Sequence, residues 1–287
     1  MTAADSIFLA APSPAGDADG DGERVRPTEH ARGPWDPHAL HGGAPAALMT
    51  AAFERAEPGS DLRIARLGFE FLRPVPLAPL VLRTRIVRPG RRVQELAGEL
   101  RVASSDDGAG EGELVCRASA LRVRAVPEGV SAHETRPRER ERAPDALGTP
   151  AAAAPVRFAL DGSEQDSFAT SAMEMRALGD PRQPGPACVW MRLRHPLLAG
   201  EPLTPLVRLA ATADFGNGVS ASLPFDRFLF INADLVVHLQ RQPRGEWIGL
   251  DARTLLHEGG TGLAESVLHD EHGAVGRAFQ TLVVQPR

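Results

Sequence analysis

Hydrophobic and polar positions divide the chain into two blocks of similar order, each with one apolar helix and several long strands. In the first block, Gly42–Glu54 is rich in Ala and carries no charge before its last residue, and Pro45 suits the first turn of a helix. Apolar stretches separated by Pro, Gly and Asp signals follow this helix. We expect them to be strands at Leu62–Leu72, Leu80–Arg88, Arg92–Ala103 and Leu114–Val126.

The second block repeats this order around an apolar helix expected at Thr204–Phe215. Its closing strand can be set beside that of the first block, because Cys116-Arg117-Ala118 aligns with Gly276-Arg277-Ala278. This repetition predicts an internal duplication. The expected strands of the second block are Phe168–Leu178, Cys188–Leu193, Phe228–Gln240, Glu246–His257, Leu263–Asp270 and Val275–Gln285.

The repeated order of elements predicts an α+β fold. A helix followed by long hairpin-connected strands can bury its apolar face only by lying across a curved antiparallel sheet. Two such sheets can pair edge to edge, which covers strand edges that would otherwise be exposed. A chain of 287 residues is long enough for two cores of ordinary size. We therefore expect two tandem units, each with a central helix wrapped by a curved antiparallel sheet.

Composition breaks suggest where these units begin and end. Residues 12–24 are rich in Gly, Asp and Pro, which is typical of a loop, so we expect an N-terminal arm at residues 1–28 and the first unit at 29–126. An Arg/Glu cluster at 136–142 and an Ala/Pro tract predict a linker at 127–155, followed by the second unit at 156–287. A mixed-sign cluster of this kind is more typical of a solvated surface than of a partner site.

Charge and residue types exclude several kinds of chemistry. The net charge is −5, all 32 cationic residues other than His are Arg, and Lys and Tyr are absent. Nucleic acid is therefore not an expected partner, and Schiff-base chemistry or a phosphate-loop lysine is excluded. The sequence has no Gly-x-Ser-x-Gly or His-Glu-x-x-His motif, so we expect no metal site and no cofactor.

Compartment is inferred from the cysteines and from the apolar runs. Cys116 and Cys188 each lie in an apolar stretch, which favours free thiols in a reducing compartment. No run of 18 apolar residues and no signal-like start is present. We expect a cytoplasmic protein without a membrane span, and we also expect a homo-oligomer.

Several motifs together resemble the acyl-CoA thioesterase superfamily. His41-Gly42-Gly43 opens the first helix, and Glu70-Phe71-Leu72-Arg73-Pro74-Val75-Pro76 follows it. The resemblance covers residues 29–287 outside the linker and is closest to double-hotdog thioesterases related to bacterial acyl-CoA thioesterase II. It implies a double hotdog fold and the hydrolysis of an acyl-CoA to a free acid and CoA. In the second block it rests on Asp214-Phe215-Gly216-Asn217-Gly218, Ile231-Asn232-Ala233-Asp234-Leu235, Arg241-Gln242-Pro243-Arg244-Gly245-Glu246-Trp247 and Gly276-Arg277-Ala278-Phe279-Gln280.

The resemblance also implies a catalytic site of an Asp, a Thr or Ser hydroxyl and a Gln that together hold a water against the thioester carbonyl. Asp214 and Gln280 match the first and last of these positions, and Asn232 falls on the middle one. The sequence departs from the family there, because an amide can bond a water but cannot relay a proton as a hydroxyl does.

Alignment of the two blocks places the polar residues in the second. Gln280 aligns with Ala120, and Asn232 aligns with Ala65. Matching Pro45 to Pro205 sets Glu54 opposite Asp214. We infer that the second block keeps the catalytic site and that the first has lost it.

Thioester hydrolysis needs a positioned water, a base and donors for the developing oxyanion. Asp214 is the candidate base, although an Asp before Gly216-Asn217-Gly218 is also typical of a turn. Gln280 taken alone is equally consistent with a solvent-facing strand residue, and Asn232 with a local backbone bond.

Substrate-binding candidates lie at the start of the first helix. Free amides of Gly42 and Gly43 at a helix N-terminus suit an oxyanion, and the resemblance implies that they face Asp214 from the opposite half. A tight turn into the helix, with His41 as a surface cap, is the alternative. Trp35 and Trp190 are candidates for the wall of an acyl tunnel, although large aromatic residues are often plain core.

Two other functions compete with thioester hydrolysis. A non-catalytic acyl-CoA-binding protein is consistent with the missing hydroxyl at position 232. A hotdog enoyl-CoA hydratase would need a catalytic Asp and His within one helix-loop segment. The nearest His after Asp214 is His238, well along the next strand. The sequence does not specify the acyl chain length.

Overall fold

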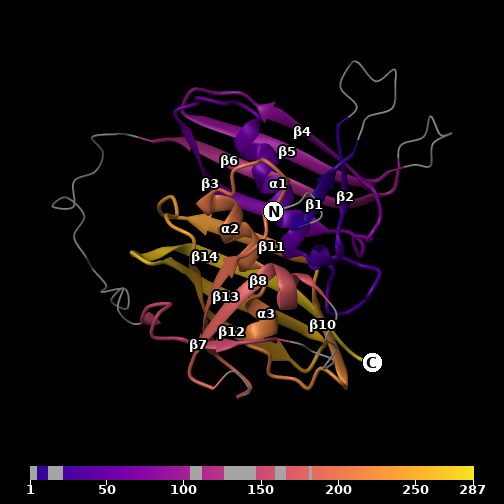
Figure 1. The fold of residues 1–287 in the computed structure, drawn as a ribbon, viewed down its shortest axis with the longest axis vertical. Helices are drawn as coiled ribbons and strands as arrows, with labels where there is room; N and C mark the ends of the chain where they lie inside the picture. Colours follow the sequence, from indigo (N-terminus) through magenta and orange to yellow (C-terminus); the bar gives the residue numbers. More distant parts are fainter. Residues whose placement is uncertain (1–4, 12–21, 104–111, 126–146, 159–165, 181–182) are drawn as a thin grey trace.

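The fold is a double hotdog in a computed structural model that describes residues 5–11, 22–103, 112–125, 147–158, 166–180 and 183–287. The first half contains one long helix and four long antiparallel strands, as the sequence predicts (Figure 1). Their bounds are α1 Gly43–Arg55, β3 Leu62–Phe71, β4 Leu80–Arg88, β5 Val93–Val102 and β6 Leu114–Arg124.

The second half has the same plan with more elements. A π-helical turn, η4 Phe168–Ala172, replaces the first part of the expected strand Phe168–Leu178, because the Ser167 hydroxyl accepts the Thr170 N–H and caps a turn there. The helix expected at Thr204–Phe215 ends at Ala213 and is followed by a short separate helix, α3 Gly216–Val219. The other elements are β7 Ala154–Val156, β8 Met173–Leu178, β9 Ala187–Leu193, α2 Pro205–Ala213, β10 Phe228–Asn232, β11 Asp234–Leu239, β12 Ile248–His257, β13 Thr261–Asp270 and β14 Gly273–Pro286.

The strands of the described residues, which include β1 Phe8–Ala10 and β2 Glu23–Pro27, belong to one sheet. Their order is β1-β2-β4-β5-β6-β3-β11-β14-β13-β12-β9-β8-β7, with β10 beside β14. The two halves join where β3 and β11 pair antiparallel, with Gly68 opposite Val236. Figure 1 shows the first half, in indigo and magenta, above the second half, in orange and yellow. The predicted α+β fold with two helix-wrapping antiparallel sheets is confirmed.

Two differences from the sequence analysis have local causes. Part of the expected arm forms β1 Phe8–Ala10 and β2 Glu23–Pro27, and β2 extends the sheet beside β4. These strands are too short to give a periodic signal, although Phe8 and Val25 are fully buried. The single strand expected at Phe228–Gln240 is divided at Ala233, whose N–H bonds Thr281 O while its carbonyl accepts Phe71 N–H. Residues 12–21, expected as a loop, and most of the predicted linker lie outside the described residues.

The core holds α1 between its own sheet and α2. Almost every residue from Gly43 to Phe53 is buried, including Leu48, Met49 and Phe53. The two helices lie very close, because a Cβ added at Gly43 would be only 2.5 Å from Ala211 O. Small residues in α1 therefore permit a tight contact between the helices of the two halves.

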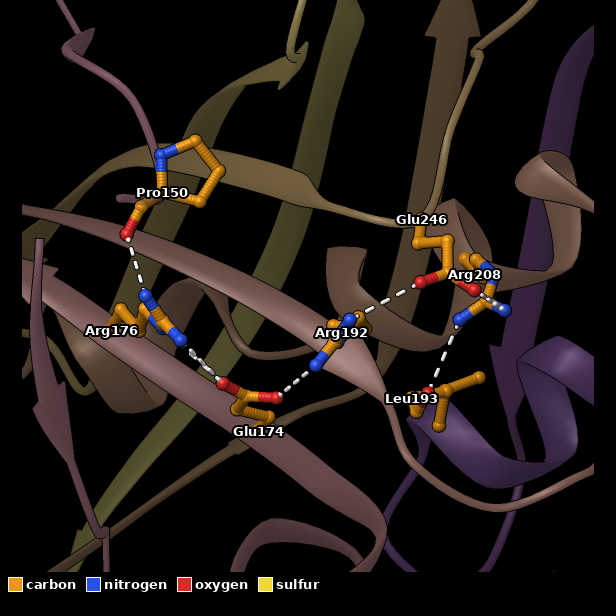
Figure 2. A network of polar contacts seen from close by, with 7 residues as sticks. All are labelled: Pro150, Glu174, Arg176, Arg192, Leu193, Arg208 and Glu246. Atoms are coloured by element: carbon orange, nitrogen blue, oxygen red, sulfur yellow. Dashed lines mark hydrogen bonds and ion pairs between the residues drawn. The ribbon is translucent and has the colours of Figure 1, made fainter. Parts of the chain in front are cut away.

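A network of charged side chains connects α2 to the neighbouring strands (Figure 2). Glu174 bonds Arg176 and Arg192, and Glu246 bonds Arg192 and Arg208 of α2. Burial favours the neutral form of Glu174, but the hydrogen bonds from both arginines hold its pKa below its ordinary value. The network thus links β8 and β9 to the helix that leads to Asp214. Among the described helices, none is long and apolar enough to cross a membrane.

Candidate active site

The C-terminal end of α2 faces the N-terminal end of α1, and Asp214 lies at this junction. Asp214 is 4% exposed, and its carboxylate lies against Gly42, where an added Cβ would be 2.8 Å from Asp214 Oδ2. Only glycine permits this approach, because any side chain would displace the carboxylate. The junction therefore brings together residues from both halves, at the place that the resemblance implies.

Two side-chain amides hold the Asp214 carboxylate. Asn232 Nδ2 donates to Asp214 Oδ1 over 2.8 Å, and Gln280 Nε2 donates to the Asp214 carbonyl over 3.0 Å and to Oδ1 over 3.3 Å. Gln280 Oε1 accepts the Asn217 N–H over 3.0 Å, which fixes the orientation of the Gln280 amide. The structure therefore places the three predicted catalytic residues in one cluster.

Gln280 is buried rather than solvent-facing, with 1% of its surface exposed. Its amide group is bonded to Asp214 and Asn217, and it does not line the adjacent cavity, whereas Asn232 does. Gln280 thus contacts Asp214 from behind the cavity wall, whereas Asn232 contacts it from the wall itself. Sequence reasoning missed the part of Asn217, although its motif was among those that carried the resemblance.

His41 is the partner of Asp214 from the other half. Its Nδ1 lies 3.0 Å from Asp214 Oδ2 and also 3.0 Å from the Gly43 N–H donor. A protonated Nδ1 can donate to the carboxylate, whereas an unprotonated Nδ1 can accept from the Gly43 N–H, but it cannot do both at once. The position of a proton between His41 and Asp214 therefore decides which of these two bonds His41 makes. The ring stacks on Phe215 at 4.2 Å and packs against Phe168 at 5.1 Å between centroids, which fixes its plane.

The backbone N–H groups of Gly42 and Gly43 differ in their hydrogen bonding. The Gly43 N–H is bonded to His41 Nδ1. Within the described part of the chain, the Gly42 N–H has no acceptor, and Gly42 lines the cavity. The N-terminus of a helix of 13 residues thus lies at the wall of the cavity, where its partial positive charge favours an anion.

A cavity of about 440 Å³ opens beside these polar groups. Trp35 is part of its wall and packs edge-on against Phe230 at 5.2 Å and against Phe225 at 5.6 Å. Trp190 lies elsewhere, in a separate apolar cluster with Leu147 and Trp247, so the expectation that it lines a tunnel is wrong. The larger apolar residues in the rest of the wall are Leu40, Phe71, Leu72, Val75, Leu229, Ile231 and Val283.

Cys116 is buried, and its surroundings disfavour the reactive thiolate form. Burial raises the pKa of Cys116 to about 12, with a further contribution from the negative charges of Glu70 and Asp214. Within the described residues, neither Cys116 nor Cys188 forms a disulfide. The arrangement around Asp214 thus offers a carboxylate, an imidazole, an amide and a backbone N–H, which suit acid-base chemistry on a bound carbonyl compound.

The chain belongs to the acyl-CoA thioesterase family. Residues 31–123 match the acyl-CoA thioesterase N-terminal domain, and residues 127–284 match the acyl-CoA thioesterase C-terminal domain. This result confirms the resemblance inferred from the motifs, and it supports a thioester hydrolase. No curated protein sequence gives a significant match.

Solved structures share the whole fold at low sequence identity. A putative thioesterase II from Thermobifida fusca YX superposes with a TM-score of 0.70 at 17% identity, covering 93% of this chain and 94% of that chain. A putative thioesterase from Novosphingobium aromaticivorans has a TM-score of 0.68 at 20% identity, covering 95% and 99%. The acyl-CoA thioesterase II TesB2 from Mycobacterium marinum has a TM-score of 0.63 at 17% identity, covering 94% and 95%.

Proposed function

We propose that this protein hydrolyses fatty acyl-CoA thioesters to a free acid and CoA by direct attack of a water. The observation that carries the proposal is the contact of Asp214 with His41 and Gly42 across the two halves, at the wall of a mainly apolar cavity. Such a cavity suits an acyl chain, and the polar groups at its wall suit the thioester.

In this proposal the thioester carbonyl oxygen accepts the Gly42 N–H, and the α1 dipole stabilises the oxyanion as it forms. Asp214, held by Asn232 and Gln280, takes a proton from the water while the water oxygen attacks the carbonyl carbon. The C–S bond then breaks, and the departing sulfur receives that proton. Asn232 retains a side-chain oxygen that can accept the second water hydrogen.

The role of His41 is to hold or share the proton at Asp214. The imidazole faces the carboxylate oxygen that the two amides leave free, so a proton taken from water has an adjacent acceptor. His41 thereby takes over the proton relay of the hydroxyl that is missing at position 232, because an imidazole can relay a proton whereas an amide cannot.

Free-thiol release from acyl-CoAs of acetyl to palmitoyl length tests the proposal, and the chain length with the highest kcat/KM defines the substrate. The contact between His41 and Asp214 brings together, from the two halves, the His and Asp that a hydratase would use. Hydration is therefore measured in parallel, as the loss of the conjugated enoyl absorbance of a 2-enoyl-CoA. Hydration without thiol release would replace the proposal with a hydratase. Calorimetric binding of acyl-CoA without either reaction would replace it with a binding protein.

A further inference from the structure

The helix junction that holds Asp214 has a counterpart at the other end of the same two helices. Because α1 and α2 lie antiparallel, the C-terminal end of α1 faces the N-terminal end of α2. There Glu54 Oε2 accepts a hydrogen bond from Thr204 Oγ1 over 2.6 Å. Glu54 precedes Asp214 in the sequence by as many residues as Ala120 precedes Gln280. Each helix N-terminus thus meets a carboxylate from the end of the other helix.

The counterpart differs in the groups around its carboxylate. Ala120 stands where the second half has Gln280, and Arg122, two residues further along the same face of β6, reaches α1 instead. The Arg122 guanidinium donates to Phe53 O and to Gln94 Oε1, and it is 3% exposed. Its positive charge also acts on Glu54, whose pKa is raised by burial and lowered in part by Thr204 and Arg122. Glu54 and Arg122 also line a cavity of about 350 Å³ at this end of the helix pair, yet the hydrogen bonds that they make here join groups of the protein.

We propose that Glu54 and Thr204 are positioning residues, whose hydrogen bond fixes how far α1 is displaced along α2 and so sets the distance from His41 and Gly42 to Asp214. This inference rests on the proposed function for its catalytic consequence. An α-helix of this length is about 20 Å long and keeps its rise per residue when it moves along its axis. A lengthwise displacement of α1 at Glu54 is therefore transmitted to Gly42 at its other end.

The geometry at the active-site end makes such a shift costly. A Cβ would lie 2.8 Å from Asp214 Oδ2 at Gly42 and 2.5 Å from Ala211 O at Gly43, so the two helices are already closely packed here. The room for α1 to move is therefore along α2 or away from it. Displacements on the order of 1 Å between reacting groups reduce catalytic rates by about 100-fold. A hydrogen bond at the far end of the helices is thus able to control turnover without touching substrate.

Paired substitutions test this inference. We expect Glu54→Ala and Thr204→Val to lower kcat by about tenfold or more and leave KM unchanged, because the acyl cavity is intact. Glu54→Gln keeps an acceptor for Thr204, and Thr204→Ser keeps both the donor and the cap on Val207 N–H, so both should retain nearly full kcat. The double variant Glu54→Ala/Thr204→Val should lose no more than Thr204→Val alone, which already lacks both the Glu54 bond and the cap.

Glu201→Gln is the matched control. Glu201 bonds Arg55, the neighbour of Glu54, across the same two halves, but this ion pair is exposed and should contribute little. We expect its kcat to equal that of the wild type. A fall in kcat equal to that of Glu54→Ala would show that any contact between the halves has this effect, and would overturn the specific role of Glu54 and Thr204.

The imidazole resonances of His41, measured by nitrogen NMR, make the test independent of turnover. Glu54→Ala should shift them, and Glu54→Gln should restore them. If Glu54→Ala does not fold, Thr204→Val, which preserves the side-chain volume, carries the test. Unchanged kcat and unchanged His41 resonances in a folded variant would overturn the inference. A wild-type protein without thioesterase activity would refute the proposed function alone, and the His41 resonances would still decide the role of Glu54.

Discussion

Replacement of Gln280 by Ala removes the group that connects Asp214 to α3. The Asp214 carbonyl loses its 3.0 Å donor, and the Asn217 N–H loses its 3.0 Å acceptor. Both residues are less than 10% exposed, so each group is left buried without a partner. An unsatisfied buried group costs about 1–3 kcal/mol, which predicts a loss of about 2–6 kcal/mol in the free energy of unfolding. This is a large share of the stability of a typical protein.

Urea denaturation followed by Trp fluorescence measures this loss, with Gln285→Ala as the control, because Gln285 is exposed on the same strand. Gln280→Ala should lower the midpoint with little change in slope, whereas Gln285→Ala should change neither. The folded fraction of Gln280→Ala should also show a lower kcat, since Asp214 Oδ1 keeps only the Asn232 amide. A loss of less than 1 kcal/mol would refute the assignment of Gln280 as the brace of Asp214.

Three further predictions concern the same site and its supports. Gly42→Ala should reduce kcat by about 100-fold or more with modest loss of stability, because its Cβ would lie 2.8 Å from Asp214 Oδ2; wild-type kinetics would contradict this contact. Asn232→Thr should at least preserve kcat, since it restores the family hydroxyl, and kinetic assays showing lost activity would mean that the amide bond to Asp214 is essential. Burial lowers the pKa of His30 below its ordinary value of 6.5, and so does repulsion from His195, whose ring stacks on that of His30 at 4.1 Å between centroids. The unfolded chain therefore binds the proton more readily, so the stability that His30 contributes is present above pH 6.5 and declines as the pH falls below it. His30→Asn should flatten this decline in urea titrations at several pH values, and an unaltered slope would contradict it.

Most elements follow from the sequence because hydrophobic periodicity is local. The helix expected at Gly42–Glu54 and most of the long strands lie where the apolar pattern places them. The exceptions are Phe168–Leu178, which begins as a π-helical turn, and Phe228–Gln240, which is divided in two. Short elements escape this reasoning, as β1 and β2 show, since three to five residues hold too few periods. The predicted domain boundaries, cytoplasmic location and homo-oligomer stay predictions.

The site is only partly predictable because its contacts are long-range. Asp214, Asn232 and Gln280 were expected to meet, but the bond between His41 and Asp214 depends on how the antiparallel β3–β11 pairing sets one half against the other. No local pattern carries that information.

One alignment between the halves was also displaced by a residue. Leu282 pairs with Asn232, and its counterpart Arg122 pairs with Ile64, so Ile64 rather than Ala65 corresponds to Asn232. The same offset holds beyond the β-bulge that follows Ile64, because Gly68 pairs with Ser119 and Val236 pairs with Phe279. Because Ile64 is also apolar, the inference that the first half lacks this part of the polar cluster is unaffected.

The central claim is that Asp214 supplies the base for thioester hydrolysis, and Asp214→Asn tests it most directly. The substituted side chain should fold in place, because its oxygen can accept from Asn232 and Gln280 while its amide donates to His41 Nδ1. We predict that kcat/KM for thiol release from the best acyl-CoA falls by about 100-fold to 10,000-fold, with the circular dichroism and melting temperature of the wild type nearly retained. Wild-type thiol release by a folded Asp214→Asn protein would contradict the account.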